Sequence, residues 1–212
     1  MLVTTLSALK SRELSIDREK LSEHLGKTPE DDEPLALESI FASNGLIDAL
    51  EACRSIEGHK GVIRLYACNC AKLVLPIIEA QHPDDQRPRK AVETAERFAR
   101  GQATKKELVA AEKGALSAAW DYSDSSRIMN EGWNPKVDAP VFEAAKAVRD
   151  AVKSGEGFNA RQVVEKTLKA AWYIAYFAEW SAAETAAYEA VHARLHGEFL
   201  RLCRLEGYGE VD

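Results

Sequence analysis

The sequence is poor in cysteine, in long apolar runs and in the marks of a leader peptide. Its 212 residues hold four cysteines, too few for a disulfide scaffold and without the paired spacing of a zinc site. No run of about 18 apolar residues is present, which argues against a helix that spans a membrane. The first ten residues lack a basic start and a long apolar stretch, so we expect no secretory signal and a cytoplasmic location.

A basic excess is also lacking. The chain carries 28 lysines and arginines against 34 aspartates and glutamates, and this net charge of −6 argues against nucleic acid as the main ligand. Residues 1–58 hold 6 basic and 12 acidic residues, so the whole net charge can be assigned to them. Two interpretations stay open. Either the segments neutralise one another when they pack, or an acidic face complements a basic partner and speeds its encounter.

Strand signals are nearly absent, because no segment alternates apolar and polar residues between turn residues. Helical spacing recurs throughout, and the connections are short, which favours antiparallel neighbours. We therefore predict an all-α bundle of about seven to nine mostly antiparallel helices with no significant sheet. We predict a short N-terminal helical segment over residues 1–30 and a single helical domain over residues 31–212. Within that domain we place a family-like core at about 36–120 and Ala-rich helices at 139–206.

Residues typical of helix ends place several boundaries. Ser15 or Asp17 is typical of the start of a short helix, and Gly26 is typical of its end. The acidic residues before Pro34 predict a helix that begins there and runs to Asn44. Pro76 predicts a kink or an end in the apolar segment 59–82. Thr104 and Glu107 form a capping box that opens a helix through Leu108, Ala111, Ala115 and Trp120.

Metal-binding chemistry has two candidate motifs. Glu79 with His82 and Glu189 with His192 are both Glu-x-x-His, the ligand pair that ferritin-like di-metal bundles use twice. Two such matches are close to chance in a chain this rich in glutamate, and His82 lies next to a proline at a helix end. His192 and His196 are one turn apart and lack the glutamate of the metalloprotease helix motif. We expect no metal, no cofactor and no catalytic residue.

Two surface features remain. In the turn 82–90 we expect Asp84 or Asp85 to cap the following helix, with Arg87 or Arg89 pairing with either carboxylate. Residues 123–138 are predicted to form a long loop that exposes Met129 and Trp133, residue types that are enriched at protein interfaces. The alternative is that Trp133 folds back on the bundle.

Three stretches resemble one family. They are Ser43-Asn-Gly-Leu-Ile-Asp-Ala-Leu, the segment 63–76, and the segment 82–101 with its Pro-Asp-Asp-x-Arg-Pro-Arg turn and Phe-Ala-Arg-Gly end. In order and spacing they resemble the Imm-5-like immunity proteins of bacteria and related phage-associated helical proteins. The resemblance covers about residues 36–120, and the loop 123–138 departs from it.

The resemblance implies a non-enzymatic protein that neutralises a cognate bacterial toxin by occlusion. The alternatives are a phage or prophage accessory protein and a ferritin-like di-metal oxidase. The partner would be a protein, such as a basic toxin, and the chain itself a monomer or a homodimer. The candidate partner-binding residues are Asp31, Asp32, Arg127, Met129 and Trp133.

Overall fold

The computed structural model describes residues 1–12, 14–28, 30–56, 58–123, 132, 134–153, 160–177 and 182–206. Within these residues lie eleven α-helices, one 3₁₀ helix and two strands of two residues each. The predicted all-α class is confirmed, with more helices than the predicted seven to nine. In chain order the elements are β1 (Val3–Thr4), α1 (Leu6–Ser11), α2 (Arg18–Leu25), β2 (Leu35–Ala36), α3 (Leu37–Asn44), α4 (Leu46–Ala52), η1 (Cys53–Ser55), α5 (Lys60–Lys72), α6 (Leu75–Gln81), α7 (Arg87–Ala99), α8 (Lys105–Tyr122), α10 (Pro135–Ala151), α11 (Ala160–Phe177) and α12 (Ala182–Arg204).

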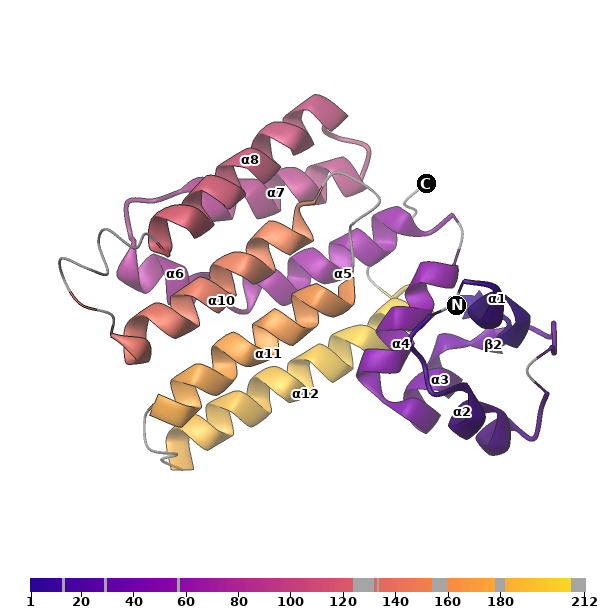
Figure 1. Cartoon of the computed structure of the whole chain (residues 1–212). Coiled ribbons are helices and arrows are strands. Elements are labelled where there is room, and N and C mark those ends of the chain that lie inside the picture. The colour runs from indigo at the N-terminus through magenta and orange to yellow at the C-terminus, as the bar shows by residue number, and fades with distance from the viewer. Residues whose placement is uncertain are drawn as a thin grey trace.

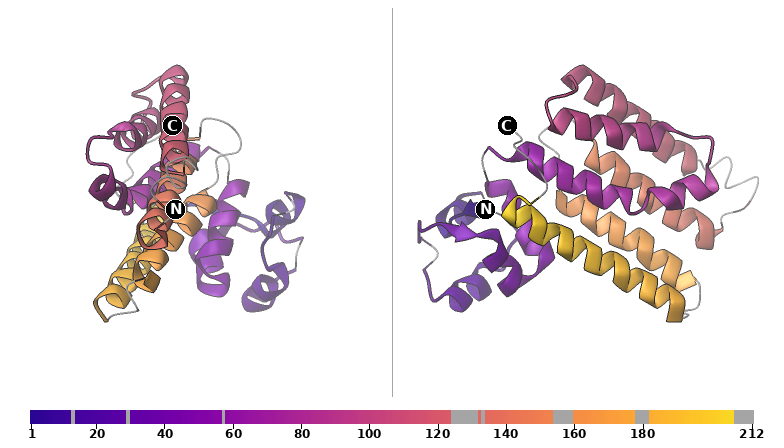
Figure 2. Two further views of the ribbon diagram at one scale, coloured as in Figure 1. Left: turned by 60° about the vertical axis from the view of Figure 1, so that its left-hand side comes forward. Right: turned by 180° about the vertical axis from the view of Figure 1, so that it is seen from behind.

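The long helices form a broad layer, and the elements β1 to η1 form a smaller N-terminal lobe at one end of it (Figure 1). The left view of Figure 2 shows the layer nearly edge on, with the lobe standing off one of its sides. Helix α10 packs against α11, α8, α6 and α5, and α12 packs against α11, α5 and α3. The helix α12 therefore joins the layer to the lobe.

Helix α5 is the most buried part of the layer. Nine of its residues are buried, and it contacts α7, α10, α11 and α12. Pro76 lies in the first turn of α6, where its missing N–H breaks no helical bond, and α5 and α6 meet at an angle of 42°. Among the described residues no single helix is long and apolar enough to cross a membrane, and only α5 and α6 taken together across this bend pass such a test.

The predicted helix start at Pro34 is wrong by three residues. Residues 35–36 form β2, which pairs antiparallel with β1 in the register Val3 with Ala36 and Thr4 with Leu35, and α3 begins only at Leu37. The pairing partner lies more than 30 residues away, so the local sequence signal could not reveal it. This strand pair joins residues on both sides of the predicted boundary between residues 30 and 31.

The predicted loop 123–138 is shorter than expected where the structure describes it. Helix α10 begins at Pro135, with Pro at the first position and the Asn134 side chain accepting a hydrogen bond from the Lys136 backbone N–H at 3.2 Å. These are regular helix-start signals, and they place residues 135–138 in the helix and not in the predicted loop.

Two glycines offer a matched pair of stability tests. Gly45 joins α3 to α4 with φ 89° and ψ −177°, a region open almost only to glycine. Gly114 lies inside α8, and a Cβ built there meets nothing within 4 Å. We expect Gly45→Ala to lower the free energy of unfolding by about 1–2 kcal/mol and Gly114→Ala to raise it by about 0.5–1 kcal/mol. Urea unfolding of both variants tests this, and equal signs would contradict it.

Buried carboxylates join α10 to α11. The side chains of Glu143 and Asp150 are almost fully buried, and each is paired across the helix boundary, Glu143 with Lys169 at 3.0 Å and Asp150 with Lys166 at 2.8 Å. Buried charges are tolerated only when they are paired. These two pairs therefore fix how the two helices are aligned.

Candidate protein-binding surface

Among the described residues of the longer helices, the outer face of α8 carries the exposed large apolar side chains. The capping box predicted from the sequence is confirmed, because the Thr104 side chain accepts from the Glu107 backbone N–H and the Glu107 carboxylate accepts from the Thr104 N–H. The helix then runs for 18 residues. Its inner face packs against α7 and α10, and consists of Leu108, Ala115, Ala118, Ala119 and Tyr122.

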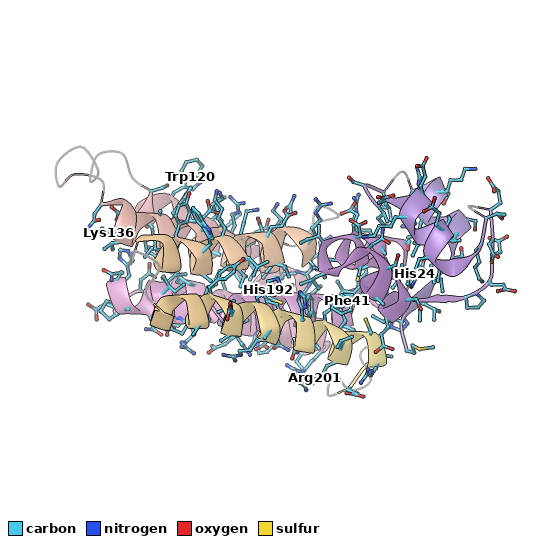
Figure 3. All side chains as sticks on the ribbon, turned by 90° about the horizontal axis from the view of Figure 1, so that it is seen from below. His24, Phe41, Trp120, Lys136, His192 and Arg201 are labelled. Carbon is cyan, nitrogen blue, oxygen red and sulfur yellow. The ribbon has the colours of Figure 1, made fainter. Side chains whose placement is uncertain are left out.

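Two large apolar side chains point away from this core. The side chain of Trp120 is 67% exposed and that of Leu116 is 38% exposed. They are four residues apart, so they lie one above the other on the helix, and Trp120 projects from the edge of the layer in Figure 3. In the described part of the chain the other exposed large apolar residues are Met1 and Val3, in the N-terminal lobe. Tryptophan in such a position is typical of a residue that anchors a protein interface.

Lysines accompany the apolar pair. Lys106, Lys113 and Trp120 are spaced seven residues apart, so they share one face of the helix, and both lysines are exposed. No ion pair joins either lysine to a described residue, whereas Glu107 is paired with Arg97 at 2.6 Å. We call Lys106, Lys113, Leu116 and Trp120 the α8 surface. It is apolar toward the C-terminal end of the helix and positively charged toward the N-terminal end.

A network of side chains fixes the turn between α6 and α7 against the end of α8. The Arg87 guanidinium donates to both oxygens of Asp85, and its Nη1 donates to Asp121 at 2.6 Å. Tyr122 donates its hydroxyl to Asp85 at 2.7 Å, while its ring stacks on His82 with centroids 4.2 Å apart. Asp121 and Tyr122 directly follow Trp120, so this network holds the backbone that carries the tryptophan.

The Asp85 carboxylate is the centre of the network. Hydrogen bonds from Arg87, with further bonds from Tyr122 and the Arg87 backbone, hold its pKa down to about 2 despite partial burial. Burial, followed by the bond to the Asp85 carboxylate, raises the pKa of Tyr122. Both groups therefore keep their donor and acceptor roles across the physiological range.

This shift predicts an acid-sensitive contribution to stability. The folded-state pKa of Asp85 lies below its ordinary value of 3.8, so the stabilisation is complete above about pH 5 and is lost as the pH falls toward 2. We expect Asp85→Asn to remove roughly 2 kcal/mol at pH 7 and to flatten the fall in stability between pH 4 and 2. The control is Asp84→Asn, because Asp84 is exposed and forms no hydrogen bond with a described residue. Equal effects of the two variants, measured by thermal unfolding, would contradict this.

The other arginine of the turn pairs with a carboxylate of α6. Arg89 donates through Nε and Nη2 to Glu79 at 2.7 and 2.8 Å, and not to Asp84 or Asp85. The reason is geometric, since Arg89 lies in the first turn of α7 and faces α6, where Glu79 is one turn from the helix end. Only Asp85 and Arg87 form the predicted type of pair.

The acidic candidates lie in the N-terminal lobe, and their charge is partly engaged there. Asp31 is half-buried, accepts from the Glu33 backbone N–H at 2.8 Å and lies 3.5 Å from Lys27. Asp32 accepts from the Ser7 hydroxyl. Both carboxylates thus order the segment before β2. Whether they also bind a partner stays a prediction.

The remaining candidates, Arg127, Met129 and Trp133, lie outside the described residues. The exposure of Trp120 is not predicted from the sequence, because the predicted inner stripe of this helix includes Trp120. At 3.6 residues per turn, Trp120 lies about 140° around the helix from Ala115. Tyr122 continues the stripe and is buried. This angular spacing is the signal that could have identified the α8 surface.

The metal-binding motifs do not assemble into one centre. Glu79 is bound by Arg89, and His82 is stacked on Tyr122. Across the described ranges no group of three or more His, Cys, Asp or Glu side chains is placed to hold a metal ion. All four cysteines are buried free thiols, and burial raises the pKa of Cys68 to about 12, which disfavours the reactive thiolate.

Comparison with known proteins supports the resemblance noted from the motifs. Residues 55–128, about a third of the chain, match the family described as Imm-5 like putative immunity protein. The resemblance predicted from the sequence is confirmed over this segment, which runs from the end of η1 through α8. Searches of curated proteins and of solved structures each found no match. The α8 surface lies inside the matched segment.

Proposed function

We propose that this protein binds a toxin protein and neutralises it by occluding its active surface, without enzymatic activity of its own. The family match over residues 55–128 supports an immunity-type role at a coarse level. The observation that carries the proposal is the exposure of Trp120 and Leu116 on one face of α8, within that segment. Both proteins would meet in the cytoplasm.

The chemistry of the α8 surface defines the partner. A tryptophan anchor requires an apolar pocket on the toxin. Lys106 and Lys113 are exposed and lie on the N-terminal side of Trp120, so they favour acidic groups beside that pocket. We propose a toxin surface with an apolar pocket and an acidic rim.

A second candidate surface is the N-terminal lobe around Asp31 and Asp32. Its excess of acidic residues would suit a basic toxin, as the sequence predicts. These carboxylates already form bonds with Lys27, Ser7 and the Glu33 backbone. The N-terminal lobe is therefore a weaker candidate than the α8 surface.

The test is co-expression with the proteins encoded by the adjacent genes. We expect one of them to arrest growth of a bacterial host when expressed alone, to lose that effect with this protein present, and to co-purify with it. A toxin from an unrelated gene neighbourhood is the control and should still arrest growth. If no neighbour is toxic and the flanking genes are those of a prophage, the accessory-protein alternative is favoured and the immunity role is rejected.

A further inference from the structure

Two histidines on α12 lie side by side, away from the α8 surface. His192 and His196 are four residues apart, so their side chains share one helix face. Their ring centroids are 4.2 Å apart, with 47° between the ring planes. Both side chains are half-buried, which leaves part of each ring open to solvent.

Aromatic contacts fix the position of His196. Its ring lies edge-on to Phe41 of α3, with centroids 5.2 Å apart and an interplanar angle of 86°. Phe41 in turn packs against the buried ring of Phe199 at 5.4 Å. Figure 3 shows His192 and Phe41 in the region where α12 approaches the N-terminal lobe. Both histidines lie on α12, and Phe41 of α3 packs against His196 and fixes its position.

The nearest carboxylate after the two histidines on α12 is bound elsewhere. The closest acidic residue along the helix toward its C-terminus, Glu198, is bound by Asn69 at 2.7 Å and by Arg201 at 3.0 Å. That carboxylate has partners of its own.

The separation of the rings suits two ligands of one ion. Ring nitrogens about 2.0–2.1 Å from a metal, at an angle of about 90°, place the two ring centroids about 4.5 Å apart. A tetrahedral angle would place them about 5.2 Å apart. The observed separation of 4.2 Å lies within a few tenths of an ångström of the right-angled case. Right-angled pairs are typical of tetragonal or square-planar Cu²⁺ and Ni²⁺.

We propose that His192 and His196 form a two-histidine site for a divalent transition metal ion, Cu²⁺ or Ni²⁺, whose other positions are taken by water. The proposal goes beyond toxin binding and is independent of it. Two ligands on one ion act as a chelate, because the second bond forms at a high effective concentration.

The test uses the full chain without a polyhistidine tag, titrated with CuCl₂ in a calorimeter and followed by electron paramagnetic resonance. We expect one site with a spectrum that reports two coordinating nitrogens. His192→Ala and His196→Ala should each weaken Cu²⁺ binding about 100-fold. His24→Ala is the control, since His24 is an exposed histidine on α2 with no neighbouring histidine, and it should leave the affinity unchanged.

Folding and metal binding can be separated in this design. His192→Gln keeps a polar side chain of similar length. Circular dichroism reports whether His192→Gln and the two alanine variants retain their helices. A folded His192→Gln variant that binds Cu²⁺ as tightly as the unaltered chain would overturn the proposal. So would loss of binding in only one of the two alanine variants, because a single ligand does not make this site.

Discussion

Asp150→Asn is expected to lower the free energy of unfolding by about 3 kcal/mol, because removing one member of a buried ion cluster leaves its partners uncompensated. The Asp150 side chain is only 1% exposed. It accepts from Arg149 at 2.8 Å and is paired with Lys166 at 2.8 Å and Lys153 at 3.4 Å. Burial alone would raise its pKa, but the bonds from Lys166 and Arg149 outweigh burial and leave the pKa below its ordinary value. Its contribution is therefore present at neutral pH and lost in acid.

The matched control for Asp150→Asn is Glu165→Gln in α11. Glu165 is also paired with an arginine, Arg161 at 2.8 Å, but its side chain is 44% exposed. An exposed pair contributes about 0–1 kcal/mol, so this variant should unfold at nearly the same urea concentration as the unaltered protein. Similar losses in the two variants would show that burial of Asp150 is not the cause.

Trp120→Ala is expected to weaken binding to the toxin by about 2–4 kcal/mol, or roughly 30- to 1000-fold in Kd. The side chain is 67% exposed, so the protein itself gains little stability from it. Its thermal unfolding should therefore stay unchanged while the dissociation rate of the complex rises. Surface plasmon resonance with the neighbouring gene product measures both rates, and differential scanning fluorimetry measures the unfolding.

Two further variants locate the interface. Val3→Ala truncates an exposed apolar residue of the N-terminal lobe and should leave Kd unchanged. Asp32→Lys tests the acidic candidate surface, and it should slow association only if a basic toxin docks on the lobe. If Asp32→Lys weakens binding and Trp120→Ala does not, the α8 surface is not the interface.

Local signals predicted much of the fold because their cause is local. Asp17 caps α2 and Gly26, at φ 62°, ends it, while Thr104 and Glu107 open α8. Each of these helix ends depends on groups within a few residues of one another. A short stretch of sequence therefore includes both partners of the interaction. The pairing of β1 with β2 depends on contacts between distant segments, and the helix start near Pro34 was therefore misplaced.

The candidate site also combines local interactions, which the sequence predicts, with interactions between distant segments, which it does not predict. The Asp85–Arg87 pair spans two residues and could be expected from the turn sequence, whereas the Arg89–Glu79 pair depends on how α6 and α7 are placed. The exposure of Trp120 was predictable from helix geometry alone, but its role as the centre of a surface was not. That role depends on which face of α8 is covered by α7 and α10.

The contact between Leu2 and α12 has a consequence for how the chain folds. The Leu2 backbone N–H donates to the carbonyl of Cys203 at 2.8 Å, and Arg204 pairs with Glu38 at 2.6 Å. These partners are separated by about 165 to 200 positions in the sequence, so the loop that they close is almost the whole chain. The contacts of the segment that carries β1 are therefore completed only after α12 has left the ribosome. We expect the N-terminal lobe to be the last part of the molecule to become resistant to protease during synthesis.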